Sequence, residues 1–273
     1  MMAPLRILSA DAPGERRSVL CVGKREPIAC FIDRWAPGTP RAYYGAVLDA
    51  IVRTPAPDLS GVFVDLEQGE AAFLRMARGD EALHVGQRLR VQVVCEARQS
   101  KVARVKAVAP DEEPCSAFEA WRRLYGAEHI EPQPDTAFVE GIFDLVLAPN
   151  VALPGGGRIN ISSTKALVAI DVDRLGREDK GSAGARALAI GAEAVQTAIQ
   201  QLILRNLGGL CVIDLPGPLN KASGERLQMA ALQSFERHTL HQAKVLKPSS
   251  LGLMEMSLPW RFRPLHETLA AEG

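Results

Sequence analysis

Two apolar segments near the middle of the chain have the pattern of β-strands and enclose a segment with helical period. The strand patterns are KALVAIDVD at 165–173 and LCVIDL at 210–215. Between them, apolar residues recur every three to four positions, and Ser182 can cap a helix that continues to about Asn206, with Gly208–Gly209 as its stop signal. This order predicts a β-α-β unit with a right-handed crossover and parallel strands.

Each of these two predicted strands ends in aspartate, with Asp171 and Asp173 on the first and Asp214 on the second. Neighbouring strands lie about 4.8 Å apart, so Asp171 and Asp214 would stand side by side at the carboxyl edge of the sheet, where open α/β folds bind ligands. Two carboxylates that close repel each other unless a cation compensates, and Mg²⁺ is usually held by one or two carboxylates together with waters and phosphate oxygens. The alternative is that each aspartate only forms a turn or caps a helix.

Residues 42–108 have the short alternating segments and glycine turns of an all-β region. About five strands predict a small OB-type barrel, a fold that binds single-stranded nucleic acid by stacking bases on aromatic side chains over a basic groove. The candidate contacts are the aromatic and basic residues Phe63, Phe73, Lys101, Arg104 and Lys106. Residue type alone favours the alternative, in which both phenylalanines lie in the barrel core and the basic residues form a solvated strand face.

The remaining patterns predict supporting elements. Residues 5–35 suggest two or three short antiparallel strands before a proline and glycine boundary at 37–40, and an amphipathic helix around Trp121 follows the barrel. Further helices are expected from about 137 and 223, a hairpin turn at Gly155–Gly157, and a strand in 251–257. His238 and His241 would face one side of the last helix, without a third metal ligand at matched spacing. Arg261 and Arg263, beside Trp260 and Phe262, suggest an RNA or partner contact or a cap on the core.

Composition narrows the class of protein. The chain has 273 residues, 47% of them hydrophobic, and 32 basic residues balance 32 acidic ones, so any nucleic-acid contact must come from a local patch. The five cysteines are scattered without a CxxC pair, which argues against zinc and disulfides and for reduced thiols. The N-terminus lacks an apolar signal region, and no run approaches a membrane span, so a cytoplasmic location is expected.

Four segments together resemble the ribonuclease E/G family. They are SGVFVDLEQGEAAFLR at 60–75, LPGGGRINISSTKALVAIDVD at 153–173, QQLILRNLGGLCVIDL at 200–215 and KPSSLGLMEMS at 247–257. The resemblance implies a mixed α/β chain with an RNase H-like subdomain, an inserted OB-type RNA-binding barrel and a DNase I-like catalytic subdomain. The expected domains are 1–38 and 109–150 for the two RNase H-like parts, the second including a hinge, 39–108 for the barrel and 151–273 for the catalytic subdomain.

The same resemblance implies a function and site residues. It implies a metal-dependent endoribonuclease that hydrolyses single-stranded RNA and leaves 5′-phosphate ends. Asp171 and Asp214 match the family's magnesium-binding aspartates, with Mn²⁺ as a substitute, and Asp173 falls where the family usually has asparagine. Phe63, Phe73 and Lys101 match the RNA contacts, so the resemblance reverses the core interpretation of the phenylalanines.

Departures from the family pattern indicate a compact, divergent member. The chain is expected to lack the 5′ sensor domain, the zinc link and the small domain, and therefore to bind no zinc and to be a monomer or dimer but not a zinc-linked tetramer. IDLPGPL at 213–219 loses a second acidic position, the loop after Asp173 differs, and Leu258–Pro259 replaces a basic cluster. An alternative function is therefore a non-catalytic RNA-binding module that keeps the fold.

Overall fold

The computed structural model describes residues 3–35, 42–67, 69–99, 101–237 and 242–270. The chain divides into two compact units. One comprises Met1–Pro4, Val19–Cys30 and Asp135–Trp260, and the other comprises Leu5–Ser18, Phe31–Pro134 and Arg261–Gly273. The predicted domain boundary between residues 38 and 39 lies outside the described residues, as do His238 and His241. The boundaries at 108 and 150 stay predictions.

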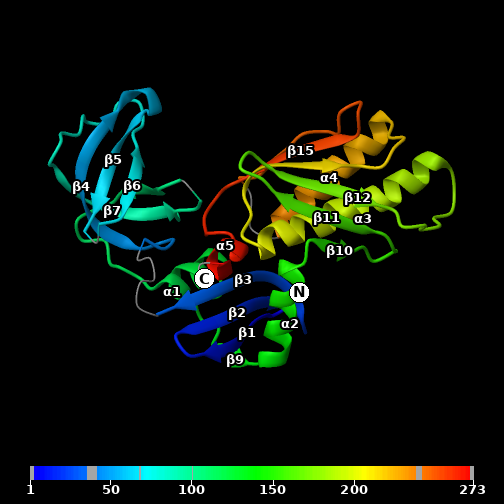
Figure 1. Cartoon of the computed structure of the whole chain (residues 1–273), viewed down its shortest axis with the longest axis horizontal. Coiled ribbons are helices and arrows are strands. Elements are labelled where there is room, and N and C mark those ends of the chain that lie inside the picture. Colours follow the sequence, from blue (N-terminus) through cyan, green and yellow to red (C-terminus); the bar gives the residue numbers. More distant parts are fainter. Residues whose placement is uncertain (1–2, 36–41, 68, 100, 238–241, 271–273) are drawn as a thin grey trace. The chain divides into compact units, whose positions relative to one another are not determined.

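Five strands close into a barrel, in agreement with the sequence pattern and compatible with an OB-type fold (Figure 1). They follow the order β4-β5-β6-β8-β7 around the barrel. Their bounds are β4 Val47–Ala56, β5 Gly61–Leu66, β6 Ala71–Arg75, β7 Arg88–Cys95 and β8 Ala103–Ala107, and the short helix η1 spans Pro57–Leu59. Alternate residues fill the interior because successive side chains of a strand point to opposite faces. On β5 these interior residues are Val62, Val64 and Leu66.

A four-stranded sheet contains three strands near the N-terminus, where the sequence predicted two or three. Its order is β3-β2-β1-β9. The bounds are β1 Leu5–Ala12, β2 Glu15–Val22, β3 Glu26–Arg34 and β9 Gln133–Pro134. The pattern did not indicate β9, a two-residue strand that joins β1 in parallel, because so short a segment has no period.

Two helices lie in the segment between the barrel and the second half of the chain. Helix α1 spans Ala117–Leu124 and begins with a capping box formed by Ser116 and Glu119, and it buries Trp121 completely. Helix α2 spans Thr136–Leu147 and begins where the Asp135 carboxylate accepts from the Phe138 amide. Both helices agree with the predictions.

The second half of the chain forms a six-stranded sheet of order β10-β11-β12-β13-β15-β14. The bounds are β10 Asn150–Ala152, β11 Arg158–Ser163, β12 Val168–Asp173, β13 Gly209–Asp214, β14 Lys244–Val245 and β15 Leu253–Leu258. β12 and β13 are parallel neighbours, which confirms the predicted β-α-β unit, and the other pairs are antiparallel.

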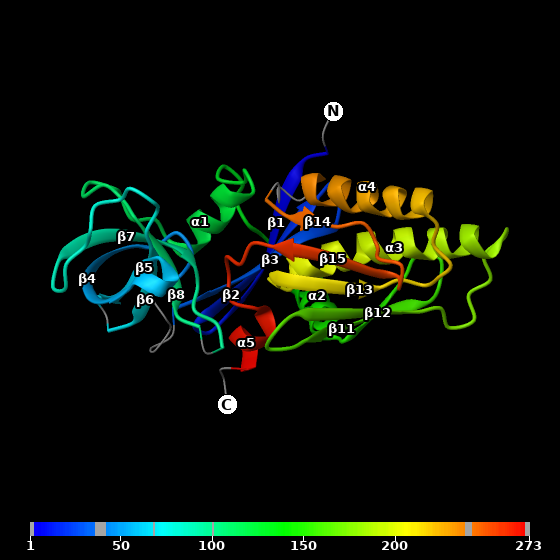
Figure 2. The same ribbon diagram turned by 90° about the horizontal axis from the view of Figure 1, so that it is seen from above.

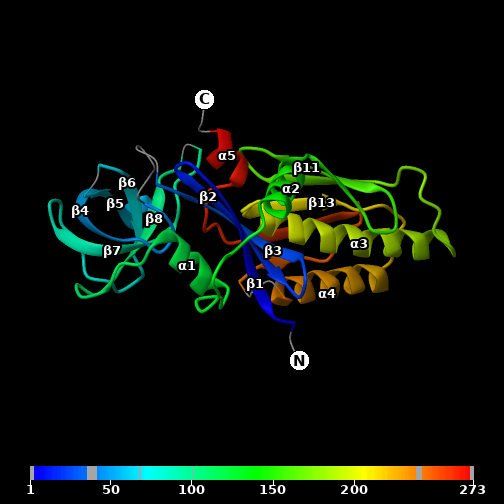
Figure 3. The same cartoon turned by 90° about the horizontal axis from the view of Figure 1, so that it is seen from below.

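Helices α3 (Ala183–Leu204) and α4 (Lys221–Arg237) cover one face of this sheet (Figure 2), and Figure 3 shows the same two helices from below. Ser182 caps α3 as predicted, with its hydroxyl accepting from the Ala185 amide. The helix ends at Leu204, close to the predicted end at about Asn206. Asn206 takes a left-handed φ of 57°, and the Leu207 amide returns to the Leu202 carbonyl, so Asn206 rather than the glycines terminates the helix.

Helix α3 is the core helix of this half. Its buried side chains include Ile190, Ile199 and Leu202, which pack on the strand residues Ile159, Ile170 and Ile213. Among the described residues it is also the one helix long and apolar enough to cross a membrane, and 61% of its apolar window is buried within the protein. The short helix α5, Leu265–Ala270, ends the described chain.

Candidate functional sites

The two strand-end aspartates are register partners. Asp171 on β12 lies opposite Asp214 on β13, and both residues are exposed. Because directly paired residues of neighbouring strands project from the same face, the two carboxylates share one face of the sheet. The side chains next to them in sequence, Ile170 and Ile213, point the other way into the core under α3. The sequence thus predicted this juxtaposition correctly.

Neutral polar side chains continue the same row toward the edge of the sheet. Asn160 on β11 is the register partner of Asp171, and Asn150 on β10 is the partner of Asn160. The Asn160 side-chain amide donates to Oδ1 of Asn150 (3.1 Å) and its Oδ1 accepts from the Ser162 hydroxyl (3.1 Å). Sequence analysis missed this strip, although RINISS alternates polar and apolar residues as a strand with one solvated face should.

Asp173 stands two residues beyond Asp171 and has protein partners. Its Oδ2 accepts from the Arg158 guanidinium at 3.1 Å, and its Oδ1 accepts from the Leu175 amide at 3.0 Å. The pair with Arg158 is more than a third exposed on both sides, so it is worth at most about 1 kcal/mol. Arg158 and the Leu175 amide would compete with a metal for these oxygens, and the role of Asp173 stays a prediction.

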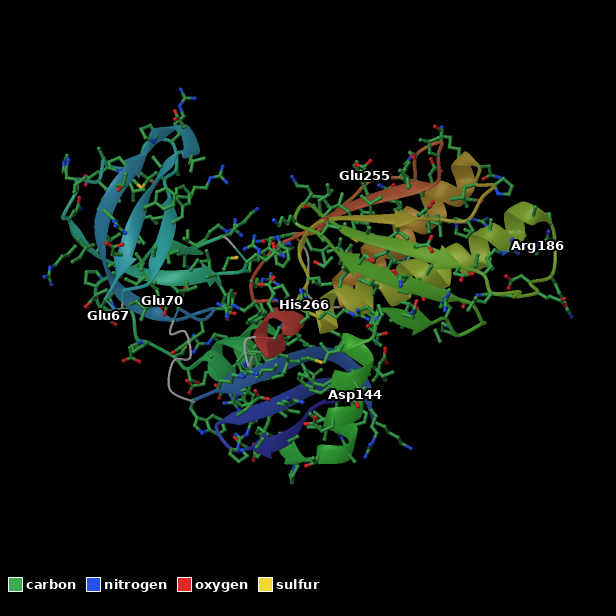
Figure 4. All side chains as sticks on the ribbon, viewed as in Figure 1. Glu67, Glu70, Asp144, Arg186, Glu255 and His266 are labelled. Atoms are coloured by element: carbon green, nitrogen blue, oxygen red, sulfur yellow. The ribbon has the colours of Figure 1, made fainter. Side chains whose placement is uncertain are left out.

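The donor set around the aspartates fits a divalent cation held mainly by two carboxylates. Within the described ranges no group of three or more His, Cys, Asp and Glu side chains is arranged around a metal position. Glu255, exposed on β15 (Figure 4), is the register partner of Val212. Val212 is two residues before Asp214 on β13, so Glu255 lies on the same face of the sheet as Asp214. No ion pair neutralises Asp171 or Asp214 in the described part of the chain, so a cation would relieve their repulsion.

An ion-pair network fixes the loops next to this edge. The buried Arg177 guanidinium binds Glu193 on α3 at 2.7 Å and Asp179 at 2.8 Å, and it donates to the Gly156 carbonyl. Hydrogen bonding to Arg177 lowers the pKa of Glu193 and raises that of the guanidinium. Glu193 also accepts from the Gly155 amide at 2.8 Å. The glycine turn and the loop after Asp173 are thereby joined, which the sequence did not reveal.

Phe63 and Phe73 lie on the outer face of the barrel and not in its core. They are register partners on β5 and β6, both are half-buried, and their ring centroids are 5.2 Å apart at an interplanar angle of 61°. Gly61 allows this packing, because a Cβ there would come within 2.5 Å of the Phe73 ring. The interpretation drawn from residue type alone is therefore wrong. Their contact with RNA, which the resemblance implies, stays a prediction.

Basic residues lie next to this aromatic pair. Arg104 on β8 is the register partner of Phe73, so Phe63, Phe73 and Arg104 form one row across three strands. Lys101 is exposed in the turn that precedes β8, where Arg98 and Lys101 exchange two backbone hydrogen bonds. The row has the aromatic and cationic groups that single-stranded nucleic acid requires.

Comparisons with a family model and with individual proteins both find similarity to ribonucleases of one family. The model of the ribonuclease E/G family matches residues 90–259. The chain is 35% identical over 138 residues to ribonuclease E of Escherichia coli and 33% identical over 134 residues to ribonuclease E of Buchnera aphidicola from Acyrthosiphon pisum. These alignments cover 49% of this chain in both cases, but 12% and 14% of the relatives. A putative ribonuclease E of Buchnera aphidicola from Baizongia pistaciae is 32% identical over 153 residues, which is 52% of this chain and 34% of that protein.

Proposed function

Since the chain belongs to the ribonuclease E/G family, we propose that it is a metal-dependent endoribonuclease that hydrolyses single-stranded RNA. The observation that carries this proposal is the register of β12 and β13, which pairs two exposed aspartates on one face of a sheet. Adjacent carboxylates are an electrostatic liability in a protein without a cation, whereas a nuclease needs them. The chain aligns with 12–34% of the length of the three relatives named above. Its activity, substrate and partners are therefore proposals, and they are argued from the residues of this chain.

In this proposal Asp171 and Asp214 supply the anionic oxygens that hold Mg²⁺, or Mn²⁺ in its place. The bound ion would polarise the phosphoryl oxygens and generate a nucleophile from water, with 5′-phosphate products as the expected result. Asp173 would contribute a further oxygen in competition with its hydrogen bond to Arg158. The neutral strip of Asn150, Asn160 and Ser162, in which Asn150 and Ser162 are exposed and Asn160 is half-buried, offers hydrogen bonds to sugar or phosphate oxygens without adding negative charge.

The barrel supplies RNA binding. Phe63 and Phe73 present ring faces on which bases can stack, a contact typically worth about 1–3 kcal/mol per base. Lys101 and Arg104 can neutralise phosphates, and each such contact makes binding sensitive to salt. The RNase H-like and DNase I-like assignments of the other parts belong to the same proposal, as do the predicted domain boundaries.

The first test is cleavage of a labelled, unstructured single-stranded RNA in Mg²⁺, compared with EDTA and with the Asp171→Ala/Asp214→Ala variant. The matched control is Asp144→Ala, which removes an exposed aspartate from α2 in the same unit (Figure 4). Cleavage that the control keeps and that EDTA and the double variant abolish would support the proposal. Digestion of the products by a 5′-phosphate-dependent exonuclease would test the predicted ends.

Intact RNA after incubation with either Mg²⁺ or Mn²⁺, together with RNA binding that Phe63→Ala weakens, would replace this proposal with the non-catalytic RNA-binding module.

A further inference from the structure

The segment that follows β15 and contains α5 is packed onto the end of β7 within the same unit. Phe262 is 7% exposed, and its ring lies 5.0 Å from that of Tyr44 and 6.2 Å from that of Phe31. Leu265 is 2% exposed. The burial of these two side chains packs the segment onto its neighbours and, for Phe262, favours the predicted cap on the core over the alternative contact with RNA or a partner.

Hydrogen bonds tie the same segment to the residues directly after β7. The Glu96 amide donates to the Arg261 carbonyl at 2.8 Å, and the Glu96 carboxylate accepts from the amides of Arg263 (2.8 Å) and Tyr44 (2.9 Å). Burial raises the pKa of Glu96, and those two amides oppose the shift. Arg263 Nε also donates to the Ala97 carbonyl at 3.1 Å.

One further hydrogen bond connects α5 with the turn that carries Lys101. The Glu267 carboxylate, from α5, accepts from the Gln99 amide at 3.0 Å. Gln99 has a φ of 46°, in the left-handed region that residues other than glycine seldom adopt. A residue held there depends on its surroundings to fix it, and Glu267 provides the hydrogen bond acceptor.

We propose that Glu267 is a positioning residue for the Lys101 turn, because its carboxylate holds the Gln99 amide and so fixes the direction in which Lys101 leaves the barrel. The inference rests on the proposed RNA contact of Lys101. Glu267 would add nothing to RNA affinity through its own charge, since a carboxylate repels phosphates. Its benefit comes from preorganisation of a lysine that would otherwise have to be ordered when RNA binds.

Whether RNA affinity falls or rises when Glu267 is removed distinguishes a positioning role from electrostatic repulsion of the RNA. If Glu267 positions Lys101, Glu267→Ala weakens binding of a fluorescent, unstructured RNA oligonucleotide by about the same factor as Lys101→Ala, which we expect to be about threefold to tenfold for one phosphate contact. Glu267→Gln keeps an acceptor oxygen for the Gln99 amide and should bind RNA almost as tightly as the original chain. The Lys101→Ala/Glu267→Ala variant should bind no more weakly than Lys101→Ala alone, because both changes remove one interaction.

The matched control is Glu81→Ala, which removes an exposed glutamate from a barrel loop of the same unit. Faster hydrogen exchange of the Gln99 amide in Glu267→Ala, with an unchanged melting temperature, would show that the turn and not the fold has loosened. Tighter RNA binding by Glu267→Ala, or losses that add in the double variant, would overturn the inference. Unchanged binding in Lys101→Ala would instead refute the proposed RNA role of Lys101, while the exchange rate would still report whether Glu267 holds the turn.

Discussion

Both candidate sites consist of side chains that β-sheet register places opposite each other, but the interaction between the two side chains is attractive in one pair and repulsive in the other. On the barrel, Phe63 and Phe73 attract each other and are stable without a ligand. On the six-stranded sheet, Asp171 and Asp214 are paired like charges that repel each other, and a bound cation would relieve that repulsion. An aromatic pair therefore has a structural explanation of its own, whereas an exposed carboxylate pair is better evidence for chemistry.

The largest effect that would test this contrast is expected at the carboxylate pair. Asp171→Asn should reduce cleavage by about 10³-fold, because the metal loses an anionic ligand. In EDTA the same variant should be more stable than the original chain by about 0.2–1 kcal/mol, since one of two opposed like charges is removed. Urea unfolding with and without Mg²⁺ measures the second effect, and Asp144→Asn serves as the control. An Asp171→Asn chain that is no more stable in EDTA would remove the electrostatic argument for a metal.

The aromatic pair should show the opposite balance between function and stability. Phe73→Leu keeps apolar packing over Gly61 but removes the ring face, so RNA affinity should fall by roughly 1–3 kcal/mol while the free energy of unfolding changes by less than about 1 kcal/mol. Fluorescence anisotropy and urea unfolding of the same preparation give the two numbers. A variant that unfolds more easily yet binds RNA as before would mean that the pair serves only the barrel.

These two pairs also show what the sequence was able to predict. The strands β12 and β13 and the helix between them were predicted from apolar runs, a helix cap and helical periodicity. Their parallel pairing followed from the helical crossover that connects them. The position of the phenylalanines did not follow from residue type. Alternation along β5 contained the answer, because Val62, Val64 and Leu66 already fill the interior and leave Phe63 outside.

Contacts between distant segments could not be predicted. Arg177 meets Glu193 only because α3 returns beside the glycine turn, and Glu267 meets Gln99 only because the last helix packs after β7. Neither contact has a local pattern, since the partners are separated by 16 and 168 residues. The position of Asn160 opposite Asp171 likewise depends on antiparallel register, which is fixed by the turn between β11 and β12.

A smaller effect on RNA affinity is expected for Arg104, the basic side chain beside the aromatic pair. Arg104→Gln should lower RNA affinity by a few fold at low salt and reduce the slope of log affinity against log salt concentration by about 1, because one phosphate contact is lost. Arg78→Gln, an exposed arginine in a loop of the same barrel, provides the matched control. If both variants lose affinity equally and keep their salt slopes, the row Phe63, Phe73 and Arg104 would not be the binding surface.

The smallest effect concerns the loops beside the carboxylate pair and depends on pH. Because Arg177 lowers the folded-state pKa of Glu193, this ion pair stabilises the chain above the ordinary glutamate value of 4.5, and the contribution is lost as pH falls below 4.5 toward the lowered value. Glu193→Gln should remove that part of the acid sensitivity. The change in the free energy of unfolding should be less than about 1 kcal/mol, because the carboxylate is partly exposed. Comparison of urea midpoints at pH 7 and pH 4 measures it. The matched control is Glu178→Gln, which removes an exposed carboxylate next to Arg177 in the same loop. If the two variants respond alike, the acid sensitivity comes from the general charge of the loop and not from its specific connection to α3.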